Sequence, residues 1–124
     1  NGDVYEGEFK ENKQDGMGKF TVPGKYVYEG EFKDDFINGH GTSTYANGDK
    51  YEGEFVNGMK EGLGTYTYAN GNKYVGSFKN GKKHGSGVIY YIDGTIEEGK
   101  WENDVLISSE LDMDDSVREE ETQE

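Results

Sequence analysis

NGDKYEGEFVNGMKEGLGTY, residues 47–66, carries aromatic residues and glycines at fixed distances from one another. Tyr51, Gly53 and Phe55 alternate with two glutamates, which is the period-two pattern of a β-strand with one aromatic and one charged face. Glycine has no side chain, so a ring from a neighbouring strand can lie over its backbone. This stretch therefore predicts a strand whose apolar face packs aromatic rings on glycine.

Nearly the same text recurs along the chain every 23 residues. The Tyr-x-Gly-x-Phe segment stands at residues 5–9, 28–32, 51–55 and 74–78, and a degenerate copy at 97–101 has Glu97 and Trp101 in place of Tyr and Phe. A Gly-x-Gly element stands in the same register at residues 16–18, 39–41, 62–64 and 85–87. Two elements in one phase indicate four full repeats and a half repeat that ends near Leu106.

Each repeat is predicted to be a β-hairpin. Residues that tolerate positive φ separate the two runs of each repeat, at Asn12, Asp35, Gly58, Gly81 and Asp104. Further turns are expected at Asn47-Gly48, Asn70-Gly71 and Asp93-Gly94, with a different turn at residues 23–25, which read Pro-Gly-Lys. Strands are expected near residues 3–10, 17–22, 26–33, 41–46, 49–56, 64–69, 72–79, 87–92 and 95–102.

One hairpin is marginally stable by itself, so the hairpins should stack on one another. The predicted fold is therefore all-β: an elongated, twisted, single-layer antiparallel sheet over residues 1–106. Residues 107–124 are expected to form an acidic tail that is disordered or a short helix. Since the chain begins with Asn1 and not with Met, we expect a fragment or a processed product.

The composition limits the class of protein. Only 31% of the 124 residues are hydrophobic, whereas a globular domain has about 45–50% apolar residues, so a single thick core is not expected. Disorder is also a poor fit, because 14% of the residues are aromatic. The chain has no cysteine, which excludes disulfides and thiolate metal sites. Its net charge of −13 opposes nonspecific binding to nucleic acid and to anionic lipid.

The pattern Tyr-x-Gly-x-Phe, a short loop and Gly-x-Gly, with its period of 23 residues, resembles the MORN repeat over residues 1–106. The resemblance implies a twisted single-layer sheet with an aromatic-lined groove, without catalytic residues or a cofactor. Members of that family are mostly scaffolds, among them radial-spoke head proteins of cilia, cytoskeletal organisers, a myosin-binding adaptor, junctophilins at membrane contacts, and arrays attached to lipid kinases or methyltransferases. A cytoplasmic protein at the cytoskeleton or the cilium is therefore expected.

The recurring rings are the candidate binding site. They stand on one face, at Tyr5, Phe9, Tyr28, Phe32, Tyr51, Phe55, Tyr74, Phe78 and Trp101. These rings can pack on each other and on glycine, and ring surface that stays exposed can form a groove for a partner helix or peptide. Both interpretations hold together if a single layer cannot bury its face completely. The expected partner-binding groove consists of Phe32, Tyr51, Phe55, Tyr74, Phe78 and Trp101. Because the surroundings are acidic, the expected partner carries Lys or Arg on its rim.

Other chemistry-bearing residues are interpreted as structural. His40 and His84 occupy different positions of the repeat, so they do not form a metal-binding pair. Paired glutamates such as Glu52 and Glu54 alternate with rings and form the solvated back of the strands. No helix-forming segment follows Gly-x-Gly, so it is not a phosphate loop. We therefore expect no catalytic or metal site and no enzyme activity.

The leading hypothesis is a noncatalytic scaffold that binds a helical or peptide segment of a protein partner, or a second copy in a homodimer, but not nucleic acid. One alternative is a membrane-associated or lipid-contact module. Charge disfavours it, since Lys79, Lys82 and Lys83 form the only local basic cluster. Another alternative is a targeting domain of a larger enzyme, which the sequence permits.

The tail over residues 107–124 has eight acidic residues and one basic residue, a net charge of −7 that leaves −6 for the array. It is either a solvated acidic tail or a short helix that docks into the aromatic groove of its own or another subunit. In the second interpretation Leu106, Met113 and Val117 share one helical face.

Overall fold

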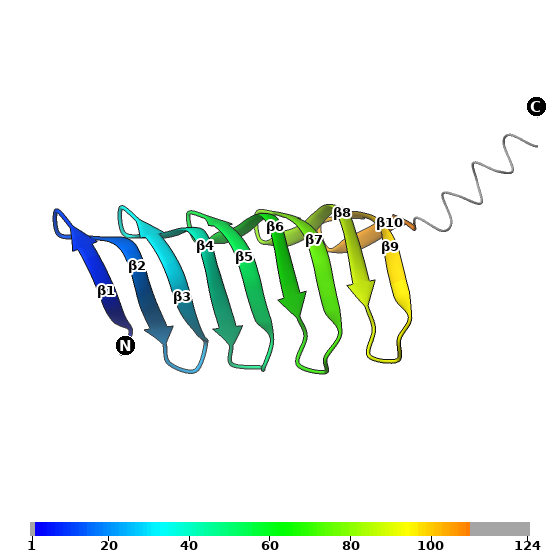
Figure 1. Cartoon of the computed structure of the whole chain (residues 1–124), viewed down its shortest axis with the longest axis horizontal. Helices are drawn as coiled ribbons and strands as arrows, with labels where there is room; N and C mark the ends of the chain where they lie inside the picture. The colour runs from blue at the N-terminus through cyan, green and yellow to red at the C-terminus, as the bar shows by residue number, and fades with distance from the viewer. Residues whose placement is uncertain (1, 110–124) are drawn as a thin grey trace, which may run out of the picture.

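The computed structural model describes residues 2–109, which form one sheet of ten antiparallel strands. Each strand pairs with the strands before and after it in the sequence. The strands are β1 Val4–Lys10, β2 Lys13–Val22, β3 Tyr26–Lys33, β4 Phe36–Tyr45, β5 Lys50–Val56, β6 Met59–Thr67, β7 Lys73–Lys79, β8 Lys82–Tyr90, β9 Ile96–Glu102 and β10 Val105–Ser109. Figure 1 shows a long single layer with β1 and β10 at opposite ends. The predicted all-β, single-layer antiparallel fold is confirmed.

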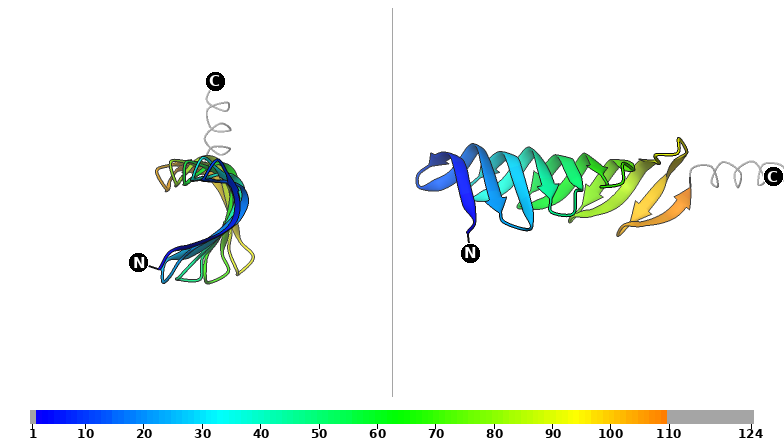
Figure 2. Two further views of the ribbon diagram at one scale, coloured as in Figure 1. Left: turned by 90° about the vertical axis from the view of Figure 1, so that its left-hand side faces the viewer. Right: turned by 90° about the horizontal axis from the view of Figure 1, so that it is seen from below.

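The sheet is strongly curved. Seen along its long axis it has a C-shaped cross-section, because all strands bend in the same sense (Figure 2). A single layer has no second layer to cover it, so its buried side chains lie on the inside of this curve. In β5 the predicted alternation is confirmed: Tyr51, Gly53 and Phe55 are buried, and the residues between them are exposed.

The turns within the repeats are tighter than predicted. Glu11 and Asn12 both have positive φ, 52° and 68°, and together form a two-residue turn between β1 and β2. The same turn recurs at residues 34–35, 57–58, 80–81 and 103–104. The predicted turn positions are thus confirmed, but the even-numbered strands begin four or five residues earlier than expected, because no loop separates the hairpin's two strands.

The last strand, β10, was not predicted from the sequence. Asn103 and Asp104 form the two-residue turn with φ of 50° and 71°, and β10 returns along β9. Its pairing continues to Ser109, which lies opposite Gly99, so the sheet extends past the predicted end at Leu106. The division into an array and a tail otherwise stays a prediction, because residues 110–124 lie outside the described residues.

The turns between repeats are longer. In the turn at residues 46–49, Gly48 has φ of 97° and its amide donates to the carbonyl of Tyr45 at 2.9 Å. The turn at residues 23–25 differs as predicted, since the positive φ falls on Gly24 at 77°. Its chain reversal is closed by the amide of Lys25, which donates to the carbonyl of Val22 at 2.9 Å.

A row of glycines crosses the sheet along its long axis, one on each strand from β1 to β9. In order of pairing these are Gly7, Gly18, Gly30, Gly41, Gly53, Gly64, Gly76, Gly87 and Gly99. Tyrosine rings lie over this row, so that an added Cβ would collide with a ring or with the neighbouring backbone at eight of the nine. The glycines therefore make room for the aromatic layer.

Each covering tyrosine also completes a β-bulge. The register between β5 and β6 shifts between Gly53 and Phe55, which leaves Glu54 out of the regular ladder. The hydroxyl of Tyr51 donates to the carbonyl of Glu54 at 2.9 Å. Equivalent bonds join the tyrosine hydroxyls at positions 5, 28 and 74 to the carbonyls of residues 8, 31 and 77. The ring thus buries apolar surface and satisfies a backbone acceptor at once.

The rings form one continuous chain of edge-to-face contacts. Tyr51 meets Phe55 of its own repeat and Phe78 of the next repeat, each with ring centroids 5.0 Å apart. The pattern repeats at Tyr5, Tyr28 and Tyr74, and Trp101 receives the last contact. Phe9 has no ring of a preceding repeat over it among the described residues, and it is 61% exposed where its equivalents are 4% exposed. Stability is therefore shared between neighbouring repeats.

Candidate binding groove

The inside of the curved sheet forms a groove whose floor consists of the predicted binding residues. All six lie together there, and they are nearly inaccessible: Tyr51 and Tyr74 are 0% exposed, and Trp101 is 6% exposed. The exposed fraction of each of the three phenylalanines, Phe32, Phe55 and Phe78, is 4%. The expectation that a single layer leaves these rings exposed is therefore corrected, because the curvature and the edge-to-face packing cover them. Whether they contribute to partner binding stays a prediction.

A second row of tyrosines offers the aromatic surface that the floor lacks. We call it the tyrosine wall; its members are Tyr26, Tyr45, Tyr66, Tyr68 and Tyr91, all half-buried and packed against the floor. Tyr45 stacks on Tyr66 with centroids 5.9 Å apart, and Tyr66 contacts Tyr68 at 5.0 Å. Tyr66 and Tyr68 alternate with threonines, and this period-two pattern puts them on the same face of the strand as Gly64. The wall was not predicted from the sequence. Tyr66 has different residues at its equivalent positions, Phe20, Ser43 and Ile89, but Tyr68 does recur, as Tyr45 and Tyr91, and this recurrence was the signal that could have found it.

Two lysines also point into the groove. Lys60 lies opposite Phe55 in the pairing of β5 with β6, and Lys83 lies opposite Phe78 in the pairing of β7 with β8. Directly paired residues lie on the same face, so both lysines share the face of the floor. The predicted basic cluster is therefore split by the sheet, since Lys79 and Lys82 are exposed and only Lys83 turns inward.

Lys83 is well satisfied in its place. Its ammonium lies 3.7 Å from the carboxylate of Asp104 and donates to the hydroxyl of Tyr68 at 3.0 Å. It also lies 5.4 Å from the centre of the Trp101 ring, within the range of a cation–π interaction. The side chain of Lys83 is 15% exposed, so this cation is held within the wall of the groove.

Lys60 has aromatic neighbours but no anion. Its ammonium lies 5.8 Å from the ring centres of Tyr45 and Tyr51 and 5.4 Å from that of Tyr66. Within residues 2–109, no carboxylate lies at salt-bridge distance from it. Burial lowers the pKa of Lys60, the nearby carboxylate of Asp104 partly offsets this effect, and the charge of Lys83 adds to it. A buried cation in this state gains from an added anion.

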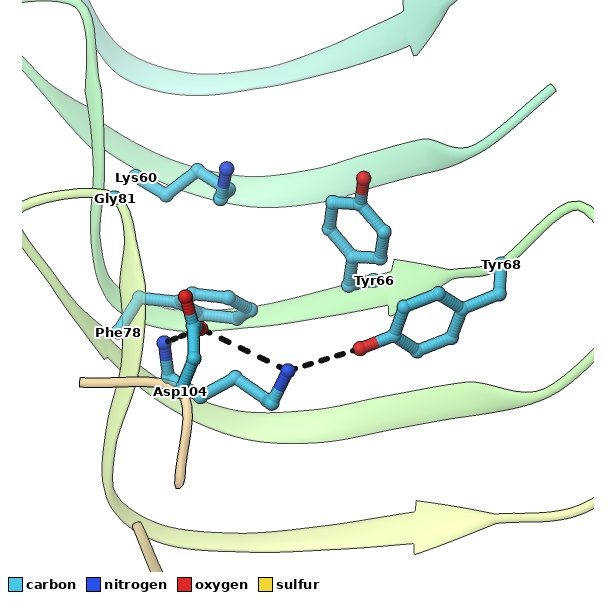
Figure 3. Close-up of a pocket in the computed structure, with 7 residues that line it drawn as sticks. Lys60, Tyr66, Tyr68, Phe78, Gly81 and Asp104 are labelled. Atoms are coloured by element: carbon cyan, nitrogen blue, oxygen red, sulfur yellow. Dashed lines mark hydrogen bonds and ion pairs between the residues drawn. The ribbon is translucent and has the colours of Figure 1, made fainter. Parts of the chain in front are cut away.

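The two lysines line one pocket of about 180 Å³ (Figure 3). Its lining consists of Lys60, Tyr66, Tyr68, Phe78, Gly81, Lys83 and Asp104. A smaller pocket of about 110 Å³ lies one repeat earlier, with Ile37 at the position of Lys60 and Tyr45 at that of Tyr68. The groove thus has depressions in equivalent places of two neighbouring repeats, of which the one around the lysines is cationic. We call it the lysine pocket.

The paired glutamates of β1, β3 and β5 face the other way. Glu52 and Glu54 are exposed on the back of β5, and Glu54 pairs with His40 at 3.1 Å. Acidic side chains also lie at the groove: Asp49 accepts from the hydroxyl of Tyr66 at 2.8 Å, and Glu97 accepts from that of Tyr91 at 3.0 Å. A partner with a basic rim stays a prediction. No group of three or more His, Cys, Asp and Glu residues that could hold a metal ion occurs in the described part of the chain. Nor does that part contain a helix long and apolar enough to cross a membrane.

The fold and the groove define a β-hairpin repeat array with an aromatic interior. The MORN repeat family matches residues 5–26, 28–50, 51–73 and 74–96, in phase with the 23-residue period. The chain belongs to the MORN-repeat family. MORN repeats are generally noncatalytic modules for interaction with proteins or membranes. A comparison with curated proteins finds no match.

Proposed function

We propose that this chain is a noncatalytic scaffold that binds a protein segment along its groove. The observation that carries the proposal is the tyrosine wall beside the lysine pocket. It offers half-buried rings, hydroxyls and cations on one continuous concave face. Aromatic side chains with polar tips are enriched at protein interfaces, because they supply contact area and hydrogen bonds together.

An elongated segment fits this surface better than a globular one. The two pockets lie one 23-residue repeat apart along the long axis, so a helix or an extended peptide laid along the groove meets both in turn. The six floor residues support this surface from below, while the wall makes the contacts. A second copy remains a candidate partner in the same mode, giving a homodimer. The cytoskeletal or ciliary location is supported by the family resemblance alone.

The test compares tyrosines on the two faces. Tyr45→Ser with Tyr68→Ser removes two wall rings, whereas Tyr90→Ser removes a ring that is 46% exposed outside the groove. A partner captured by the wild-type chain should bind the wall variant at least tenfold more weakly and the Tyr90→Ser variant unchanged, with far-UV circular dichroism confirming the fold of both. Equal loss in both variants, or no loss in either, would contradict binding in the groove.

The negative charge of the outer face disfavours the membrane alternative. Glutamates stand exposed on the back of consecutive odd-numbered strands, at positions 6, 8, 29, 31, 52 and 54. An anionic bilayer would be repelled by this face, and its curvature keeps the groove lysines from a flat surface. We therefore favour a protein partner over a lipid surface. Targeting of an attached enzyme is compatible with the same scaffold role.

A further inference from the structure

We propose that the lysine pocket binds carboxylates of the chain's own acidic segment, residues 110–124. The inference rests on the proposed function only in placing a peptide in the same groove, and it adds which segment occupies it. Residues 110–124 contain eight acidic residues and one basic residue. The pocket holds two lysines and one aspartate, and is therefore locally cationic in a chain of net charge −13.

The unpaired ammonium of Lys60 would be stabilised by an added anion. Three tyrosine rings surround its ammonium, and no carboxylate among the described residues is close enough to pair with it. In an array built of equivalent positions, residue 60 corresponds to Gln14, Ile37, Lys83 and Leu106, and three of these four are uncharged, so the fold does not require a cation there. A half-buried lysine without an ion pair is a cost to the free chain, and a carboxylate beside it would remove that cost.

The segment starts close to the pocket. The described chain ends at Ser109 on β10, two strands from Lys83 and four strands from Lys60. At about 4.8 Å per strand the farther lysine lies about 20 Å away. Fifteen residues can span about 50 Å when extended, so the segment reaches both lysines with length to spare. Tethering gives it an effective concentration of order millimolar, which favours a weak contact that a free peptide would make poorly.

The apolar residues of segment 110–124 can pack against the tyrosine wall. Met113 and Val117 stand among the acids of the segment, and the half-buried rings of Tyr66 and Tyr68 would accept such side chains beside the carboxylates. The predicted helical face with Leu106 is corrected, because Leu106 lies in β10 and packs against the floor. Met113 and Val117 themselves lie outside the described residues. Repulsion by the glutamates of the outer face, such as Glu52 and Glu54, is weak here, because charges farther apart than about 8 Å are screened at physiological salt. On the groove side, Asp104 is paired with Lys83 at 3.7 Å and Asp49 accepts from the hydroxyl of Tyr66 at 2.8 Å.

Zero-length cross-linking of the full chain tests the proposal. A carbodiimide joins an amine only to a carboxylate in contact with it, and the pairs Lys83–Asp104 and Lys33–Asp15, both 3.7 Å apart, are internal positive controls. Peptide mapping of the monomeric product should link Lys60 or Lys83 to residues 110–124 at least tenfold more often than the exposed Lys82. The links should decline several-fold at high salt and when the aspartates at 112, 114 and 115 are changed to asparagine.

Three results would overturn it. Tail links spread over the exposed lysines in proportion to their exposure would mean that the segment has no preferred site. Internal links without tail links would mean that it does not reach the pocket. Tail links found only in covalent dimers would assign the pocket to a second copy's segment. Acetylation rates give an independent readout: Lys60 should react several-fold faster in the asparagine variant than in the wild type, with Lys82 unchanged, and equal rates would contradict docking.

The proposal and the proposed function fail separately. The cross-linking uses no partner, so an undocked segment leaves the wall free to bind a protein as proposed. If the segment docks and the wall variants still bind their partner unchanged, the groove is a site for the chain's own segment and the proposed function is wrong. If both hold, the asparagine variant should bind the partner more tightly than the wild type, because the segment no longer competes for the groove.

Discussion

The ring of Tyr51 lies directly over Gly64 on the neighbouring strand, and its hydroxyl continues to the carbonyl of Glu54 at 2.9 Å. A Cβ added at Gly64 would come within 2.5 Å of ring carbons of Tyr51. The contact recurs one repeat away in each direction, with Tyr28 over Gly41 and Tyr74 over Gly87. Glycine weakens an isolated strand, but here it is what allows a single layer to bury a large ring.

Gly64→Ala should lower the free energy of unfolding by about 1–3 kcal/mol, because the ring that it meets is held on both sides by other rings and cannot withdraw. Leu63→Ala is the matched control: Leu63 is 70% exposed on the other face, and the change should cost less than about 0.5 kcal/mol. Urea denaturation followed by circular dichroism measures both. In a double variant with Tyr51→Ala the penalty at Gly64 should shrink, and additive effects would show that the ring is not the cause.

Tyr51→Phe tests the hydrogen bond apart from the ring. The carbonyl of Glu54 lies at the bulge and loses its donor when the hydroxyl is removed, so we expect a loss of about 1–3 kcal/mol. Tyr90→Phe removes the hydroxyl of a tyrosine that is 46% exposed and should change stability little. The comparison of thermal melting temperatures is decisive. Equal melting temperatures for the two variants would mean that water replaces the lost bond.

The array should unfold in alkali between about pH 10 and pH 12. Burial raises the pKa of Tyr28 and of Tyr74 to about 12, against an ordinary value of 10.0. Above pH 10 the unfolded chain releases these protons and the folded chain does not, so stability is full below pH 10 and is lost as pH rises toward 12. Tyrosinate absorbance and loss of circular dichroism should rise together. Ionisation of most tyrosines well before unfolding would contradict the burial.

The negative outer face leads to a prediction about lipid binding. The chain should not cosediment with vesicles of anionic lipid at physiological salt, because the exposed glutamates of the outer face repel them and the inward lysines cannot reach them. Vesicles of neutral lipid are the control for contacts that do not depend on charge. Strong cosedimentation with the anionic vesicles, reversed by added salt, would restore the membrane hypothesis.

The repeat pattern was sufficient to predict the single-layer sheet, the facing of residues such as Tyr51 and Glu52, and the positive φ at Asn12. The preceding residue, Glu11, also has positive φ, which nothing in its side chain indicates. It is set by the right-handed twist of the two strands, which a two-residue turn must match. The early start of the even-numbered strands and the strand β10 follow from the same tight turn, and so were missed.

The groove was predicted only in part. The cause is not the tight turn but the dependence of the groove on the shape of the whole sheet. A recurring residue indicates what every repeat needs, and the floor rings are such residues. Burial of that floor depends on the curvature of the whole sheet, which no local pattern specifies. Some of the residues left for a partner vary between repeats, such as Lys60, whose equivalents include Ile37 and Lys83. Their facing can be read from the alternation, but their convergence into one pocket needs the register of β6 with β8 through β7.

Lys60→Ile separates stability from binding at the lysine pocket. Ile37 occupies the equivalent position of the preceding repeat and packs against the floor, so the fold accepts this side chain. Burial lowers the pKa of Lys60, so the charged form is a cost to the folded state. We expect the variant to be at least as stable as the wild type at pH 7, and to lose that advantage as pH rises through the lowered pKa toward 10.5.

Lys82→Ile, a change of the same charge at an exposed residue, should show no such dependence. Urea midpoints at a series of pH values measure both variants. A marked loss of stability at pH 7 in Lys60→Ile alone would mean that the three tyrosine rings around Lys60 stabilise the cation more than its burial costs. The pocket would then be satisfied without an added anion.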